Sequence, residues 1–163
     1  IALMPESRGS NTPVPSSVPA AARTLADPSG KTVLQLKTGE NGGLLFSATY
    51  EGKNLILDSP LGLEIDRVNG GSNVNILNEE QKENGFAVYT LESAEAGAKY
   101  YLDVRVFPDG LALRYRIPAE SPRKIRKEYT GFTFPAGTRA WYASGPFQYG
   151  WMPAYQDRPV DKL

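Results

Sequence analysis

The sequence contains no cysteine and no histidine among its 163 residues. The absence of cysteine excludes disulfide bonds and thiolate-based metal or redox chemistry. The absence of histidine removes the commonest general base and every catalytic triad of the Ser-His-Asp or Cys-His kind. Any acid–base pair within this chain would therefore have to consist of carboxylates.

Net charge and long apolar segments are also lacking. Eighteen basic and eighteen acidic residues give a formal net charge of zero, which removes any global attraction toward nucleic acid or an anionic membrane surface. No apolar run approaches the roughly 20 residues of a membrane span, and no charged-then-apolar leader is present. We therefore expect a processed or recombinant segment that binds neither nucleic acid nor a membrane.

The first 27 residues differ in composition from the rest. Residues 1–27 are rich in proline, serine and alanine and have little apolar bulk, so they are predicted to be a disordered or linker-like tail. A proline-rich recognition peptide is the alternative, but no basic flank accompanies the prolines. The domain is expected at residues 28–163, a length too short for a (β/α)₈ barrel, which needs roughly 250 residues.

From residue 28 onward, short alternating runs separated by turn residues predict an all-β, antiparallel fold. The clearest hairpin covers residues 100–117. Its apolar face carries Tyr100, Leu102, Val104, Val106, Leu111, Leu113, Tyr115 and Ile117. A two-residue loop, either Pro108-Asp109 or Asp109-Gly110, keeps apolar residues opposite one another. The two loops place Asp103 opposite Arg114 or Arg116, respectively, so either gives a cross-strand ion pair.

Further strands are predicted at residues 31–37, 44–50, 54–58, 61–65, 74–77, 86–91, 129–134 and 139–142. Residues 68–85 are otherwise predicted to be an exposed polar loop. We interpret the adjacent Glu79 and Glu80 as solvated charges rather than as an acid–base pair or calcium ligands. The basic residues of segment 123–127 are interpreted as a charged edge that blocks strand pairing rather than as a phosphate-binding patch.

The last third of the chain is rich in aromatic residues and contains both tryptophans. Between residues 143 and 159 the alternation disappears and glycine and proline become frequent, so this segment is predicted to be a loop. Its candidate contact residues are Phe147, Tyr149, Trp151, Tyr155, Gln156 and Asp157. Such residues can stack on a pyranose ring and bind its hydroxyls. Packing on a neighbouring domain is the alternative, and the residues alone favour packing.

Four segments resemble, in order and spacing, the N-terminal module of glycoside hydrolase family 97. They are residues 29–56, 59–65 (SPLGLEI), 103–118 (DVRVFPDGLALRYRIP) and 130–143 (TGFTFPAGTRAWYA). The matching residues of the family's hairpin and aromatic strand are Arg105, Asp109, Gly110, Arg114, Tyr115 and Trp141. The resemblance covers about residues 27–155. It implies an antiparallel β-supersandwich, similar to galactose-mutarotase-like domains, that packs on a C-terminal (β/α)₈ barrel.

The resemblance also implies a function. Family members are mostly α-glucosidases, with some α-galactosidases, and commonly hold calcium in the barrel's active site. It therefore implies a periplasmic or secreted enzyme with an oligosaccharide substrate. We expect the catalytic residues and the metal ligands, including a glutamate that reaches calcium, to lie beyond Leu163.

Further expectations concern the segment by itself. We expect it to be inactive, to be cut before the last strands of its sandwich, and to be unstable or self-associating when expressed alone. A stand-alone carbohydrate-binding β-sandwich is the alternative function, and a structural β-sandwich without a ligand is a third.

Overall fold

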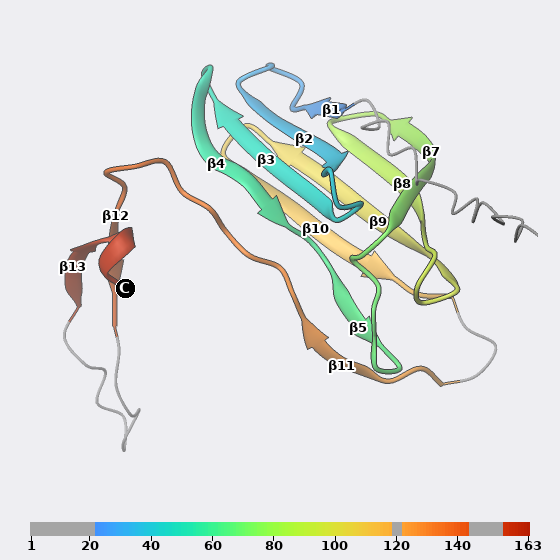
Figure 1. Ribbon diagram of the computed structural model, residues 1–163. Coiled ribbons are helices and arrows are strands. Elements are labelled where there is room, and N and C mark those ends of the chain that lie inside the picture. Colours follow the sequence, from blue (N-terminus) through green and yellow to red (C-terminus); the bar gives the residue numbers. More distant parts are fainter. Residues whose placement is uncertain (1–21, 119–121, 144–154) are drawn as a thin grey trace, which may run out of the picture.

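Two runs of strands joined by short turns form two four-stranded antiparallel sheets that pack face to face (Figure 1). The computed structural model describes residues 22–118, 122–143 and 155–163. The first sheet contains β1 (Arg23–Ala26), β2 (Thr32–Thr38), β3 (Leu44–Tyr50) and β4 (Lys53–Pro60), in that order. The second contains β7 (Val74–Lys82), β8 (Phe86–Ser93), β9 (Ala98–Phe107) and β10 (Gly110–Arg116), also in chain order. Each sheet is therefore a meander, with β7 and β10 at the edges of the second.

Two smaller sheets complete the described part of the chain. Strands β11 (Ile125–Glu128), β5 (Leu63–Ile65) and β6 (Val68–Asn69) form one of them. The other is the hairpin of β12 (Arg139–Tyr142) and β13 (Gln156–Pro159), followed by the 3₁₀ helix η1 (Val160–Lys162). Figure 1 shows this hairpin apart from the sandwich, at the end of an extended segment. No helix among the described residues is long and apolar enough to cross a membrane.

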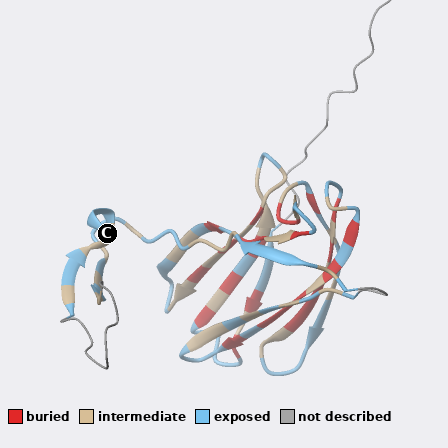
Figure 2. Ribbon diagram, turned by 90° about the horizontal axis from the view of Figure 1, so that it is seen from below, coloured by how far each residue is buried: buried red, intermediate tan, exposed pale blue. Residues whose placement is uncertain are grey.

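The core lies between the two large sheets because alternate residues of their strands point inward. In β3, for example, Leu44, Phe46 and Ala48 are buried, whereas the residues between them are half-buried. Figure 2 shows this alternation along the strands. The largest side chains in the core are Tyr89, Tyr100 and Phe46. Fully burying an apolar side chain of this kind stabilises the fold by about 1.5–3 kcal/mol. The all-β, antiparallel sandwich predicted from the sequence is thus confirmed.

The predicted hairpin is present as β9 and β10, and its loop is Pro108-Asp109, because Gly110 pairs with Phe107. The hydroxyl of Thr32, in the other sheet, donates to the carbonyl of Pro108 at 3.1 Å and so fixes the hairpin tip. The apolar face of β9 is buried as predicted. The corresponding residues of β10 are only half-buried but pack against the same core, because β10 is an edge strand.

The tail and the polar loop were predicted too long. Residues 23–26, assigned to the tail, form β1, whose Leu25 is buried in the core. Residues 1–21 lie outside the described part of the chain. The region predicted at 68–85 as a loop around a strand at 74–77 contains β6 and the whole of β7, which continues past residue 77 and pairs with β8 as far as Lys82. Its polar composition reflects an exposed edge strand and not irregular backbone.

The strand predicted at residues 129–134 is wrong. The strand lies earlier, at β11, where basic residues pair with β5. Residues 129–133 instead run beside the end of β4, with a single bridge between Leu57 and Thr133. Backbone hydrogen bonds join Tyr129 N to Gly62 O (2.8 Å) and Gly131 N to Pro60 O (3.0 Å). The strand predicted at 139–142 is confirmed as β12.

Candidate functional site

The hairpin of β12 and β13 gathers the described part of the aromatic segment. In its register Trp141 lies opposite Asp157, and Tyr142 lies opposite Gln156. Arg139, two residues before Trp141 on the same face, donates from Nε and Nη2 to the Asp157 carboxylate at 2.9 Å each. This hydrogen-bonded ion pair raises the pKa of Arg139. This face of the hairpin therefore presents the flat indole of Trp141 beside the ion pair of Arg139 and Asp157.

Trp141 is 73% exposed, and Tyr155, just before β13, is 64% exposed. An indole of this exposure can stack on a sugar ring or pack on a protein surface. The nearby ion pair supplies both donors and acceptors for hydroxyl groups. Trp141 matched the family pattern in the sequence but was not among the candidate contact residues. Its place on a strand gave no sign that it would lie on the solvent face.

The structure locates only part of the predicted contact set. Tyr155 is exposed, whereas Gln156 and Asp157 lie in β13 and not in a loop, which corrects that prediction. Gln156 Oε1 accepts a hydrogen bond from the Tyr142 hydroxyl at 3.3 Å on the other face of the hairpin. Four residues ending in proline carry too little pattern to predict a strand. Phe147, Tyr149 and Trp151 lie outside the described residues.

An open hollow of about 530 Å³ separates the hairpin from the extended segment before it. Its lining includes Phe132 and Phe134 of the extended segment and Val160 and Asp161 of η1. The two phenyl rings stack with centroids 6.5 Å apart and an interplanar angle of 19°. Phe132 is 57% exposed, although its ring also packs perpendicular to the buried ring of Phe46, with the centroids 5.9 Å apart. Exposed aromatic rings thus lie both on the extended segment and on the hairpin.

A second polar cluster lies on the outer face of the β9–β10 hairpin. The Asp103 carboxylate is only 5% exposed and accepts hydrogen bonds from two arginines. Arg116 donates from Nε and Nη2 at 2.8–3.0 Å, and Arg114 donates from Nε and Nη2 at 3.1 and 2.6 Å. The hydrogen bonds and charges of Arg116 and then Arg114 hold the pKa of Asp103 below its usual value, against the opposing effect of burial. The sequence predicted one of these ion pairs or the other, and the structure contains both.

The remaining charged segments do not form a catalytic arrangement. Glu79 points inward, 3.7 Å from Arg23, whereas Glu80 points outward to Lys82 at 3.5 Å. Adjacent strand residues face opposite sides, so these two carboxylates cannot act as a pair. Arg123 pairs with Asp66, and β11 is an exposed edge strand, in line with the charged edge that was predicted. No group of three potential ligand side chains among the described residues could hold a metal ion.

Comparison with protein families identifies a family for the C-terminal half of the chain. The model of the family described as Glycosyl-hydrolase 97 N-terminal matches residues 79–163, which is just over half of the chain. The matched region begins within β7 and includes β8, β9, β10, β11 and the hairpin of β12 and β13. A comparison with curated proteins found no significant match.

Comparison with solved structures finds enzymes of similar fold. A β-arabinopyranosidase superposes with a TM-score of 0.71 and 21% identity, over 82% of this chain and 26% of that one. A glycoside hydrolase family 97 enzyme from Pseudoalteromonas sp. strain K8, in complex with acarbose, gives a TM-score of 0.67 and 18% identity. That match covers 86% of this chain and 25% of the enzyme. A family 97 enzyme (E480Q) from the same strain has also been solved in complex with panose. The chain therefore spans about a quarter of the length of these enzymes.

Proposed function

The chain belongs to the glycosyl-hydrolase 97 N-terminal family, and from this we propose that it is the non-catalytic N-terminal part of a glycoside hydrolase. The full-length enzyme acts on α-glucosides or α-galactosides in a catalytic (β/α)₈ barrel outside this chain. The sandwich packs on the barrel, and the β12–β13 hairpin helps to shape its substrate pocket. The acarbose and panose complexes of the Pseudoalteromonas enzyme support an α-glucoside as the first substrate to try.

The observation that carries this proposal is the exposed aromatic surface at the C-terminal end. Trp141, Tyr155, Phe132 and Phe134 are all exposed there, together with Leu163. A folded protein seldom leaves this much apolar surface in water unless another surface covers it. Aromatic anchors at such surfaces commonly contribute most of the binding energy. The surface therefore supports docking on the barrel, with Trp141 as the main anchor.

The proposal also covers metal and location. The full-length enzyme is proposed to be periplasmic or secreted and to use calcium. The described residues contain no group of three or more potential ligand side chains that could hold a metal ion, and the proposal places the calcium ligands beyond Leu163. We assign no step of the reaction to this segment.

The test uses the full-length protein that contains this chain, assayed on maltose, panose and the p-nitrophenyl α-glucoside, α-galactoside and β-arabinopyranoside. We expect hydrolysis of at least one α-glucoside or α-galactoside. The variant Trp141→Ala should raise KM or lower kcat/KM by roughly tenfold, because truncating an aromatic anchor costs over about 1 kcal/mol.

The matched control is Leu77→Ala, which truncates an exposed apolar residue on β7, far from the hairpin in sequence and in the other part of the fold. It should leave the kinetics unchanged. Absence of activity on every α-linked substrate, or activity confined to the arabinopyranoside, would contradict the proposed function. Equal kinetics for Trp141→Ala and the control would remove the hairpin from the substrate pocket.

A further inference from the structure

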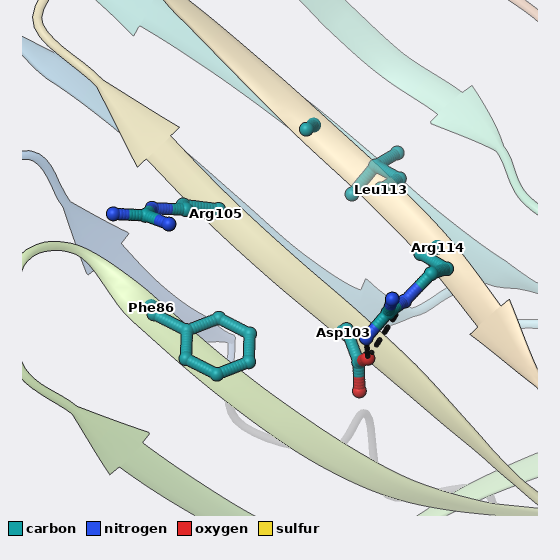
Figure 3. A pocket seen from close by; sticks show the side chains of 6 residues that line it. Phe86, Asp103, Arg105, Leu113 and Arg114 are labelled. Atoms are coloured by element: carbon teal, nitrogen blue, oxygen red, sulfur yellow. Dashed lines mark hydrogen bonds and ion pairs between the residues drawn. The ribbon is translucent and has the colours of Figure 1, made fainter.

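A shallow pocket of about 320 Å³ lies on the outer face of the second sheet, across β8, β9 and β10 (Figure 3). It is lined by Phe86, Asp103, Arg105, Ala112, Leu113 and Arg114. Figure 3 shows Phe86 of β8, Arg105 of β9 and the ion pair between Asp103 of β9 and Arg114 of β10 around the pocket. The volume is at the lower end of ligand pockets, which span roughly 300–1,000 Å³. It suits a single sugar residue.

The register explains why there is a hollow at this place. Phe86, Arg105 and Ala112 lie side by side on β8, β9 and β10. The next row along the same face holds Val88, Asp103 and Arg114. Ala112 is the smallest side chain in the two rows, so the space above it is left open between larger neighbours. A bulky residue at that position would fill the pocket without entering the core, because Ala112 is exposed on the outer face.

The polar groups of the pocket can donate hydrogen bonds but can hardly accept them. Both oxygens of Asp103 are already occupied by the guanidinium groups of Arg114 and Arg116. Arg114 uses Nε and Nη2 in this contact, which leaves Nη1 available, and 71% of its side chain is exposed. Arg105 stacks on Phe107 at 5.0 Å and forms no ion pair with any described residue. Three arginines and one aspartate leave the cluster with a net charge of +2.

We propose that this pocket binds an acidic saccharide, with the carboxylate of a uronic acid residue held by Arg114, its ring placed against Phe86, and Arg105 donating to it from the other side of the opening. Donor-only groups with excess positive charge select a ligand that carries acceptors and negative charge. The fork of a guanidinium matches a carboxylate, and an aromatic ring matches the apolar face of a pyranose. Asp103 and Arg116 act as positioning residues, because they fix the orientation of Arg114. This binding does not depend on the proposed hydrolase activity.

The test is a ligand-observed NMR titration of the full-length protein with glucuronate and galacturonate, compared with glucose and acetate. We expect a uronate to bind at least about tenfold more tightly than either control, because glucose lacks the charge and acetate lacks the ring. Binding should weaken as salt is raised, since the contact is partly exposed. Equal affinity for acetate would show a simple anion site, and equal affinity for glucose would show no role for the arginines; either result overturns the proposal.

Two variants locate the site. Ala112→Phe should abolish uronate binding by filling the hollow, and Arg105→Met should weaken it about tenfold by removing one charged donor. The control Lys99→Met removes an exposed cation from the same strand, outside the pocket, and should change nothing. Uronate binding that survives both Ala112→Phe and Arg105→Met would overturn the proposal. So would an equal loss in Lys99→Met, which would indicate general charge attraction.

Discussion

The sandwich and the C-terminal part of the chain are stabilised in different ways. Every described residue of the hydrophobic core lies between Leu25 and Val106, and beyond Val106 the described residues are half-buried or exposed. Figure 2 shows the contrast between the sandwich strands and the hairpin of β12 and β13. The C-terminal part is attached to the sandwich by individual contacts, such as the hydrogen bond from Thr133 N to Ser59 Oγ at 2.8 Å. Its apolar surface is therefore available for another surface to cover.

One ring contact spans both regions and gives the strongest test of this difference. Phe46 is fully buried, and Phe132 meets it edge to face from the exposed side. Phe46→Ala should destabilise the sandwich by about 3–5 kcal/mol through lost burial and a cavity. Phe132→Ala, which loses the same ring contact, should cost only about 1 kcal/mol. Hydrogen exchange of β8 and β9 in the full-length protein should rise by about two to four orders of magnitude in the first variant and about fivefold in the second.

Similar exchange rates in these two variants would contradict the comparison, because they would mean that the core extends to Phe132. A control for the measurement is β12, whose amides belong to the other region. Their exchange should change little in Phe46→Ala if the hairpin draws its stability from outside the sandwich.

The Asp103 cluster should give an intermediate effect. Asp103→Asn removes a nearly buried carboxylate that satisfies two arginines, and we expect a loss of about 1–2 kcal/mol. The figure is at the modest end for charged hydrogen bonds because both arginine side chains are largely in solvent, which screens them. Thermal unfolding of the variant at neutral pH measures this loss. No change in melting temperature would mean that the ion pairs of Asp103 contribute nothing to the stability of the sandwich.

The same cluster predicts a pH dependence with a definite sign. The pKa of Asp103 is lowered from its ordinary value of 3.8 in the folded state, so the folded state binds this proton less readily than the unfolded chain. The stabilisation is therefore complete above about pH 5 and is lost as the pH falls below 3.8 and through the folded pKa. Asp103→Asn should flatten this part of the acid-unfolding curve. A variant that keeps the full acid dependence would assign it to other carboxylates.

The smallest effect is expected in the hairpin of β12 and β13. Arg139→Met removes a largely exposed ion pair with Asp157, so the melting temperature should stay the same within about 1 °C. If the pair serves substrate or barrel contact instead, kcat/KM of the full-length enzyme should fall while the melting temperature stays constant. A clear loss of stability would show that contacts within the hairpin stabilise it. That result would contradict the proposed difference between the sandwich and the C-terminal part.

How far the sequence predicts this structure depends on burial. The hairpin of β9 and β10 was predictable because one face enters the core, so alternation from Tyr100 onward records which side is inside. The polar half of β7 was not predicted as a strand for the opposite reason, because an exposed edge strand needs no apolar face. Strand β1 is too short to show a period, although Leu25 anchors it in the core.

The candidate site was less predictable than the fold. The aromatic composition near the C-terminus was visible, but the strand that pairs Asp157 with Trp141 was not, because β13 has four residues and ends in proline. The pocket above Ala112 could not be foreseen either. It depends on a small residue lying in the same row as Phe86 and Arg105, and that alignment requires the register of three strands.

The meander order of the two large sheets also sets the order in which the chain can fold. Each pairing within them joins strands that follow one another, so it closes only a short loop and loses little chain entropy. The pairing of β5 with β11 joins Ile65 to Ile125, about 60 residues away, and the Leu57–Thr133 bridge spans still more chain. We expect these closures to form after the hairpins within each meander, because a longer loop costs more entropy to close. The segment that leads to the aromatic hairpin has no buried residues among those described, so its amides should exchange faster than those of the sandwich.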